Sequence, residues 1–177
     1  NVIAVRVSEH TPASDELDHM SQYADFPLAG IMRRAYLFST SPLHVARLHF
    51  NPRFDTNRRD ATLAVDITLV NESDVAEREA GAGFTLSNAD GETVATAALT
   101  QIALAPWETV RRTAEIRVRS PKQWEAEHPN LYLLRTTVSA GGRTVETLES
   151  RTGFRDVAVR GTGFLINGVP VKLKGTC

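Results

Sequence analysis

The stretch Thr62 to Val70 (TLAVDITLV) decides the fold class of this chain. Large apolar side chains stand at every second position and smaller or polar ones between them: Leu63, Val65, Ile67 and Leu69 against Thr62, Ala64, Asp66 and Thr68. Successive side chains of a β-strand point to opposite faces, so this alternation predicts a strand with one face in a core and the other toward solvent. Long helical periodicity is missing from the chain, and the sequence therefore predicts an all-β fold.

Further strands and turns follow on both sides of this stretch. The same alternation, in places weaker, marks strands at Ala114–Val118, Tyr132–Val138, Val94 and Ile102–Leu104. Turn-forming residues separate them at Asn88–Gly91 (NADG), Gly141-Gly142 and Asn167-Gly168. About seven short strands between Phe50 and Gly153, at spacings of roughly 8 to 15 residues, predict an antiparallel immunoglobulin-like β-sandwich.

The composition excludes several classes of partner and cofactor. The chain has 177 residues, with 20 Lys and Arg against 21 Asp and Glu, and a formal net charge of −1. Nucleic acids and anionic membranes bind concentrated basic surfaces, so neither partner is expected. The single cysteine, Cys177, excludes an internal disulfide and a cysteine-based metal site. His44 and His49, five residues apart on an extended stretch, are predicted to point to opposite faces, and neither a metal nor a cofactor is expected.

Three segments exceed what a sandwich of this class needs. Asn1–Ser8 (NVIAVRVS) and Arg34–Phe38 are predicted strands before the sandwich, and Gly163–Lys174 is a predicted hairpin after it. We interpret them as pieces of neighbouring domains, and the chain as part of a longer protein. Strands without partners expose their edges, so association into a homo-oligomer through these edges is expected.

Three motifs occur in a fixed order along the chain. The first is Leu28–Leu37 (LAGIMRRAYL), the second is Trp124–Tyr132 (WEAEHPNLY) followed by Gly153–Arg155 (GFR), and the third is Phe164–Gly175 (FLINGVPVKLKG). In this order and at these distances they resemble glycoside hydrolase family 2, which includes β-galactosidases, β-glucuronidases and β-mannosidases. The resemblance extends over most of the chain and includes both of its ends.

The resemblance implies a division into three parts. Residues 1–41 would be the C-terminal strands of a sugar-binding jelly roll, residues 42–158 the immunoglobulin-like sandwich, and residues 159–177 the lead-in to a (β/α)8 catalytic barrel. It also implies a retaining glycosidase whose two catalytic glutamates lie on later barrel strands, outside this chain. The chain is therefore expected to be inactive alone and to position the sugar-binding domain against the barrel. Its partners would be the other domains of the polypeptide and, in the full-length enzyme, a carbohydrate substrate.

The resemblance also suggests two substrate-binding residues. Asp25 and Phe26 precede the first motif, where the galactosidase-like pattern has an acidic residue and an aromatic that reach the sugar pocket. Ala24 stands at the acidic position and Asp25 is displaced by one residue, which in an extended chain turns a side chain to the other face. An exposed Asp beside a packed Phe is the alternative interpretation. The motifs imply structural roles for Trp124 and Arg155.

A function of another class is compatible with the same strands. A free-standing immunoglobulin-like carbohydrate-binding or adhesion module would bind sugars through exposed aromatics such as Phe26, Trp124 and the tyrosines. The carboxylate pairs that the chain does contain, Glu77 with Glu79 and Glu125 with Glu127, lie in connecting segments, where solvated side chains are expected. The sequence gives no indication of the cellular compartment.

Overall fold

The structure is a computed structural model of the 177-residue chain, and it describes residues 2–8, 11–13, 30–31, 33–173 and 175. The predicted substrate-binding residues Asp25 and Phe26 and the cysteine Cys177 lie outside the described residues. The chain divides into two compact units, of which one is Thr40–Leu173 and the other comprises Asn1–Ser39 and Lys174–Cys177. The unit Thr40–Leu173 contains all ten strands that the described residues form.

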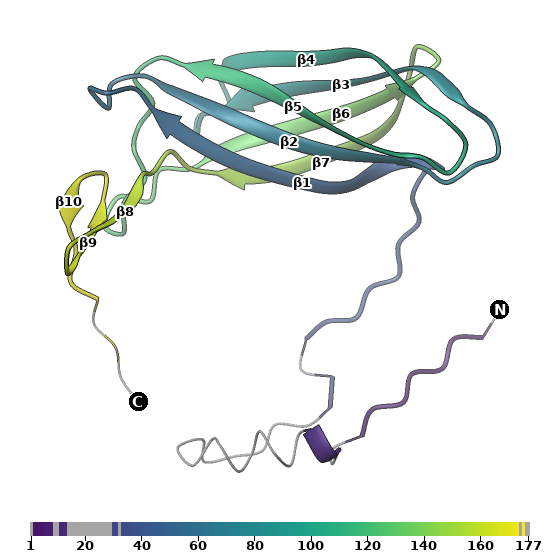
Figure 1. Ribbon diagram of the computed structural model, residues 1–177, viewed down its shortest axis with the longest axis horizontal. Coiled ribbons are helices and arrows are strands. Elements are labelled where there is room, and N and C mark those ends of the chain that lie inside the picture. Colours follow the sequence, from purple (N-terminus) through teal and green to yellow (C-terminus); the bar gives the residue numbers. More distant parts are fainter. Residues whose placement is uncertain (1, 9–10, 14–29, 32, 174, 176–177) are drawn as a thin grey trace. The chain divides into compact units, whose positions relative to one another are not determined.

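Two antiparallel sheets make up the predicted sandwich (Figure 1). The first sheet has the order β1-β2-β5, formed by Leu43–Phe54, Ala61–Asn71 and Thr109–Val118. The second has the order β4-β3-β6-β7, formed by Thr93–Leu104, Glu77–Ser87, Tyr132–Ala140 and Arg143–Thr152. The chain crosses between the sheets after β2, β4 and β5, and the pairs β1–β2, β3–β4 and β6–β7 are hairpins. These seven strands confirm the immunoglobulin-like all-β fold.

A small third sheet follows the sandwich. It has the order β10-β9-β8, formed by Val169–Pro170, Gly163–Ile166 and Val157–Arg160. The predicted Asn-Gly turn joins β9 to β10: Asn167 has a φ of 52° and Gly168 a φ of 80°, as a type I′ turn requires. Figure 1 shows this sheet at the end of the sandwich where β5 and β7 terminate.

The core lies between the two sheets of the sandwich. Alternate residues of β2, β3, β5 and β6 are almost fully buried, among them Leu63, Val65, Ile67, Leu69, Phe84, Leu86, Ile116, Leu134 and Val138. The alternation predicted for Thr62 to Val70 is therefore confirmed. Burial of a side chain of this size stabilises a fold by about 1.5–3 kcal/mol, which makes this apolar layer the main source of stability in a unit without a disulfide.

One prediction about strand β1 was wrong. The register of β1 against β2 shifts between Val45 and Arg47, where one extra residue forms a β-bulge. His44 pairs with Val70 and His49 with Asp66, both on the outer face of β2, so the two histidines share a face instead of pointing to opposite faces. The bulge inserts one residue into a period of two and so reverses the alternation beyond it.

The segments predicted as strands before the sandwich differ from the expectation. The described residues of Asn1–Ser8 and Arg34–Phe38 form no strand. Their alternating apolar residues suit a strand, but a strand also needs a hydrogen-bonded neighbour, and no pairing of these segments occurs within the described ranges.

Candidate functional site

The candidate site is the junction between the sandwich and the C-terminal sheet. It is built from the connection between β5 and β6 (residues 119–131), the residues 153–156 that follow β7, and the turn at Asn167. Two of the three family motifs, the second and the third, meet here.

Phe154 anchors the junction in the core. Its side chain is fully buried, and its ring lies edge-on to those of Tyr132 and Phe54, with centroid distances of 5.1 and 6.5 Å. The backbone N–H of Trp124 donates to the Phe154 carbonyl at 2.8 Å. Residues 123–124 and 154, about thirty positions apart, are thereby held side by side.

Tyr132 fixes the connection that leads into β6. It stands at the first position of the strand, and its hydroxyl accepts a hydrogen bond of 2.8 Å from the backbone N–H of Lys122. A tyrosine at this place that bonds back to the preceding connection is the tyrosine corner of immunoglobulin-like sandwiches. Tyr132 of the second motif therefore has a structural role in this chain.

Trp124 is half-buried and packs against Gly153 and Arg155. A Cβ atom at Gly153 would lie 3.0 Å from the Trp124 Cβ and 3.2 Å from the Asn130 carbonyl oxygen, so the backbone and the indole approach too closely for a side chain. The Arg155 guanidinium carbon lies 4.6 Å from the centroid of the Trp124 ring, a cation–π contact. The half-buried Trp124 and its neighbours Gly153 and Arg155 form one packed cluster, as expected for structural residues.

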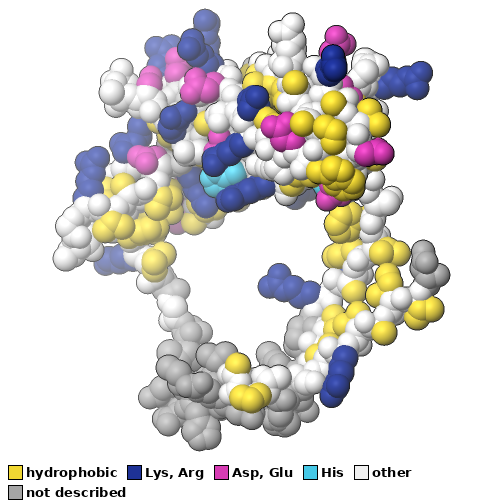
Figure 2. Space-filling model, turned by 45° about the vertical axis from the view of Figure 1, so that its right-hand side comes forward, with side chains coloured by type: hydrophobic (Ala, Val, Ile, Leu, Met, Phe, Trp, Pro, Cys, Tyr) yellow, Lys and Arg dark blue, Asp and Glu magenta, His cyan; other side chains and the backbone are white. Residues whose placement is uncertain are grey.

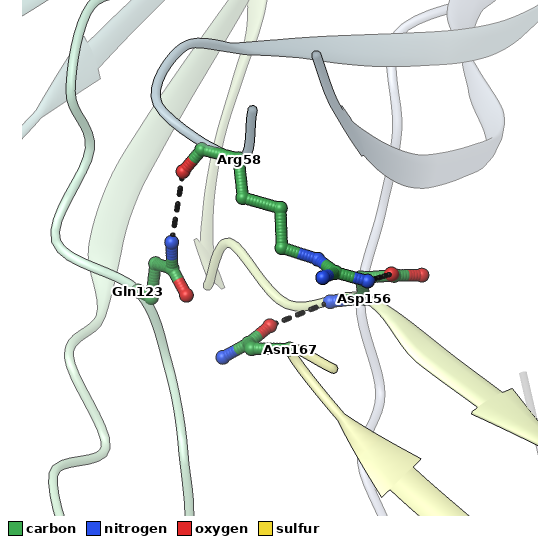
Figure 3. Close-up of polar contacts among 4 residues, drawn as sticks. All are labelled: Arg58, Gln123, Asp156 and Asn167. Carbon is green, nitrogen blue, oxygen red and sulfur yellow. Dashed lines mark hydrogen bonds and ion pairs between the residues drawn. The ribbon is translucent and has the colours of Figure 1, made fainter. Parts of the chain in front are cut away.

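Asn167 joins the C-terminal sheet to the sandwich (Figure 3). Its side-chain Oδ1 accepts from the Asp156 backbone N–H at 2.9 Å, and its Nδ2 donates to the Trp124 carbonyl at 2.9 Å. Its backbone N–H donates to the Asp156 carbonyl at 2.7 Å. A single amide side chain thus satisfies polar groups from two segments that are distant in sequence.

Arg58 ties the turn between β1 and β2 to the same place. Its guanidinium Nη2 lies 3.0 Å from Asp156 Oδ2, and both side chains are about half-buried. Its carbonyl accepts from Gln123 Nε2 at 3.0 Å (Figure 3). The guanidinium also fills the space over Gly168, where a Cβ would meet Arg58 Nη1 at 2.4 Å. Arg58, Gln123, Asp156 and Asn167 therefore hold four segments in one arrangement.

The carboxylates of the described residues do not form a catalytic pair at this junction. Glu125 lies on the β5–β6 connection, and its hydrogen bond with His128 lowers the pKa of the Glu125 carboxyl. Glu77, far along the sandwich, accepts from the Glu79 backbone N–H at 2.9 Å. Glu77 and Glu125 are thus hydrogen-bonded within their own segments. Glu77 and Glu79 were predicted to lie in a connecting segment, but both lie on strand β3.

The described residues contain neither a metal-binding cluster nor a helix that could span a membrane. Across the described ranges, no group of three or more His, Cys, Asp or Glu is arranged to hold a metal ion. In the part of the chain that the structure describes, no helix has the length and apolar character needed to cross a membrane. The hydrogen bonds and the ion pair of this junction hold the C-terminal sheet at a fixed place on the sandwich.

Comparison with known proteins identifies relatives of the whole chain. A β-galactosidase of Priestia megaterium is 30% identical over 178 residues, which cover 99% of this chain and 16% of that protein. A putative β-glucuronidase of Formosa agariphila is 29% identical over 162 residues, which cover 88% of this chain and 18% of that protein. The chain thus spans less than a fifth of the length of these two relatives.

Solved structures share the fold of the sandwich. A glycosyl hydrolase family 2 member from Bacteroides cellulosilyticus superimposes with a TM-score of 0.69 at 22% identity, over 77% of this chain and 19% of its own. A β-glucuronidase from Parabacteroides merdae superimposes with a TM-score of 0.63 at 26% identity, over 76% of this chain and 16% of its own.

A family model settles the family assignment. The model described as glycosyl hydrolases family 2 matches residues 43–155, which include the sandwich and the whole second motif. The family predicted from the three motifs is confirmed, and the chain resembles a β-sandwich domain of such a glycosidase. The chain belongs to glycosyl hydrolases family 2.

Proposed function

We propose that this chain is a non-catalytic β-sandwich segment of a family 2 β-glycosidase. In this proposal residues 1–41 end a sugar-binding jelly roll, residues 42–158 are the sandwich, and residues 159–177 lead into a (β/α)8 catalytic barrel. The small share of its relatives that the chain spans supports a segment of a larger enzyme over a free-standing binding module. Its partners are then the remaining domains of the same polypeptide, and a β-glycoside is the substrate of the whole.

The junction at Asn167 is the observation that carries this proposal. Asn167, Asp156 and Arg58 hold the segment that leads toward the proposed barrel in one position on the sandwich. A misplacement of about 1 Å at a reacting centre can lower a rate by roughly 100-fold, so a rigid spacer has catalytic value without touching substrate. The sandwich would transmit the position of the sugar-binding domain to the active-site rim of the barrel.

The proposal also covers the residues that would contact and cleave the substrate. We extend it to Asp25 and Phe26, which would reach from the sugar-binding domain toward the substrate, as the family pattern suggests. Retaining glycosidases need two carboxyl groups about 5–5.5 Å apart across the scissile bond, and the proposal assigns both to barrel strands outside this chain.

Turnover of a chromogenic substrate tests the proposal. The purified 177-residue chain is expected to release no p-nitrophenol above background from the β-galactoside or the β-glucuronide. The longer polypeptide that carries it is expected to hydrolyse one of them. Release by the isolated chain, in proportion to its concentration and retained through a second purification step, would contradict a non-catalytic role.

A further inference from the structure

Trp107 is the most unusual exposed residue of the sandwich. It lies in the turn between β4 and β5, its side chain is 69% exposed, and its φ is 60°. Bulky residues rarely adopt this left-handed conformation, which glycine adopts without cost. Because the indole is exposed, its own packing in this chain does not compensate for the strain. Strained residues of this kind concentrate at ligand sites, where the surrounding structure holds them in place.

A hydrogen-bond network holds the turn rigid. The buried Asn71 donates through its side-chain Nδ2 to the Ala105 and Val75 carbonyls, at 3.0 and 2.8 Å. The backbone N–H of Trp107 donates to the Ser73 carbonyl at 3.2 Å, which brings the β2–β3 connection beside the β4–β5 turn. The Ala105 N–H donates to Glu108 Oε2 at 2.6 Å and closes the turn. The indole is therefore presented by a fixed backbone.

The surroundings of Trp107 combine apolar surface with carboxylates. Val75 is 68% exposed, and Glu72 and Asp74 are exposed on either side of Ser73. We call Trp107 with residues 72–75 the Trp107 platform. Figure 1 shows the β2–β3 and β4–β5 connections at the end of the sandwich opposite the C-terminal sheet. Figure 2 turns this end toward the viewer, and acidic side chains lie there among apolar ones.

We propose that the Trp107 platform binds a neutral pyranose of an oligosaccharide. The apolar C–H face of the sugar would stack on the exposed indole, and its hydroxyl groups would donate to the Glu72 and Asp74 carboxylates. Glu72 and Asp74 are exposed on either side of Ser73, whose carbonyl accepts from the Trp107 backbone N–H, and two negative charges there disfavour uronic acids, phosphates and other anions. The cores of protein interfaces are depleted of such charges, which favours a sugar over a protein partner. This proposal does not rest on the proposed function. Sugar binding can be measured on the isolated chain whether or not the sandwich positions domains of a larger enzyme.

The two tryptophans allow a direct test by NMR. The chain contains only Trp107 and Trp124, so a ¹⁵N-labelled sample gives two indole N–H signals. β-1,4-linked hexaoses of glucose, galactose, xylose and mannose are titrated to about 50 mM, since a flat platform that covers one ring face supports a dissociation constant of about 1–10 mM. We expect one of these sugars to shift the Trp107 signal saturably. The signal of the half-buried Trp124 should stay unchanged.

Variants and a charged ligand complete the test. Trp107→Gly suits the positive φ and should keep the fold while binding weakens at least tenfold, and Trp107→Tyr should retain partial binding. A hexaose of glucuronic acid should bind the wild-type chain more weakly than the neutral sugar, and Glu72→Gln with Asp74→Asn should reduce that difference. The proposal fails if no hexaose gives a saturable shift, or if Trp107→Gly binds as tightly as wild type. It also fails if the Trp107 signal moves on dilution without sugar, because the platform is then an interface between chains.

Discussion

Thr136 is a polar residue in the apolar core of the sandwich. It lies on β6 with its side chain fully buried, and its Oγ1 has no hydrogen-bond partner within the described part of the chain. A buried hydroxyl without a partner costs about 1–3 kcal/mol. We expect Thr136→Val, which keeps the shape and removes the hydroxyl, to raise the free energy of unfolding by about 1 kcal/mol.

Urea denaturation measures this effect. Thr137→Val is the matched control, because the neighbouring Thr137 lies on the outer face and its Oγ1 donates only a long 3.4 Å bond to the Gly83 carbonyl. That control should change stability by less than about 0.5 kcal/mol. An unchanged or lower midpoint for Thr136→Val would show that the hydroxyl is satisfied in solution.

Asp66 makes stability depend on acid. Hydrogen bonds from Thr113 Oγ1 at 2.6 Å and Arg111 Nη2 at 2.8 Å lower the pKa of the Asp66 carboxyl below its ordinary value of 3.8. A carboxyl whose pKa is lower in the folded state stabilises the fold above the unfolded-state pKa, and this contribution is lost as the pH falls through the folded-state pKa.

The variant Asp66→Asn isolates this contribution. It should unfold at a lower temperature than wild type near neutral pH, and the difference should shrink below about pH 4 as Asp66 becomes protonated. Thermal unfolding at several pH values records both curves. Glu115→Gln, which removes an exposed ion pair with Arg53, should show little of this dependence. Parallel curves for wild type and Asp66→Asn would exclude a lowered pKa at this residue.

At the scale of elements, the strands that alternate cleanly were predictable and the irregular ones were not. β2, β5 and β6 carry large apolar side chains at every second position, and sequence alone located them. β1 was predicted only as an extended stretch around His44 and His49, because its bulge breaks the period, and β3 was not located because its sequence EREAGAGFTLS is rich in Ala and Gly. One of the two glycines in β3 has a clear packing reason: a Cβ at Gly83 would lie 2.8 Å from Thr137 Oγ1 on the neighbouring strand.

The end of β7 lies so close to the β5–β6 connection that one methyl group added at Gly153 should lower the stability of the chain substantially. We expect Gly153→Ala to destabilise the chain by about 1–3 kcal/mol, because its Cβ would press on the Trp124 side chain and the Asn130 carbonyl, neither of which can move freely. Gly163→Ala is the control: its Cβ has no neighbour closer than 3.4 Å, so it should be neutral or slightly stabilising. Chemical denaturation of the two variants should separate them, and equal midpoints would refute the packing argument.

At the scale of the whole molecule, the side chain of Asn167 should hold the C-terminal sheet on the sandwich without affecting the stability of the sandwich itself. Asn167→Gly keeps a residue that tolerates the φ of 52° and removes both side-chain hydrogen bonds. We expect backbone amides of residues 157–166 to exchange with solvent about 10–100-fold faster, while those of β2 and β6 keep their protection.

Hydrogen exchange followed by mass spectrometry or NMR resolves these regions. Asn88→Gly is the matched control, since Asn88 bonds the Asp90 and Glu92 amides within the β3–β4 turn and should not affect residues 157–166. Unchanged exchange in Asn167→Gly would mean that the C-terminal sheet is held by other contacts.

Sequence reasoning found one half of this junction. The Asn-Gly turn was predicted from its own residues, and the motifs that contain Trp124 and Phe154 were singled out by the resemblance to the family. Arg58, Gln123 and Asp156 were not singled out, because no spacing links them: Arg58 and Asp156 are separated by 98 positions and meet only when the fold is complete. Asp25 and Phe26 remain predictions outside the described residues.

The partnership of β2 with β5 affects how the chain reaches its fold. Ile67 pairs with Arg112 and Leu63 with Ile116, so these contacts close a loop that contains all of β3 and β4. The hairpins β3–β4 and β6–β7 close much shorter loops and lose less chain entropy on forming. Sandwiches dominated by such distant pairings refold on a time scale of about milliseconds to seconds. Until β5 arrives, one edge of β2 has no hydrogen-bonded neighbour, and in this interval a newly made chain is most open to aggregation or to capture by a chaperone.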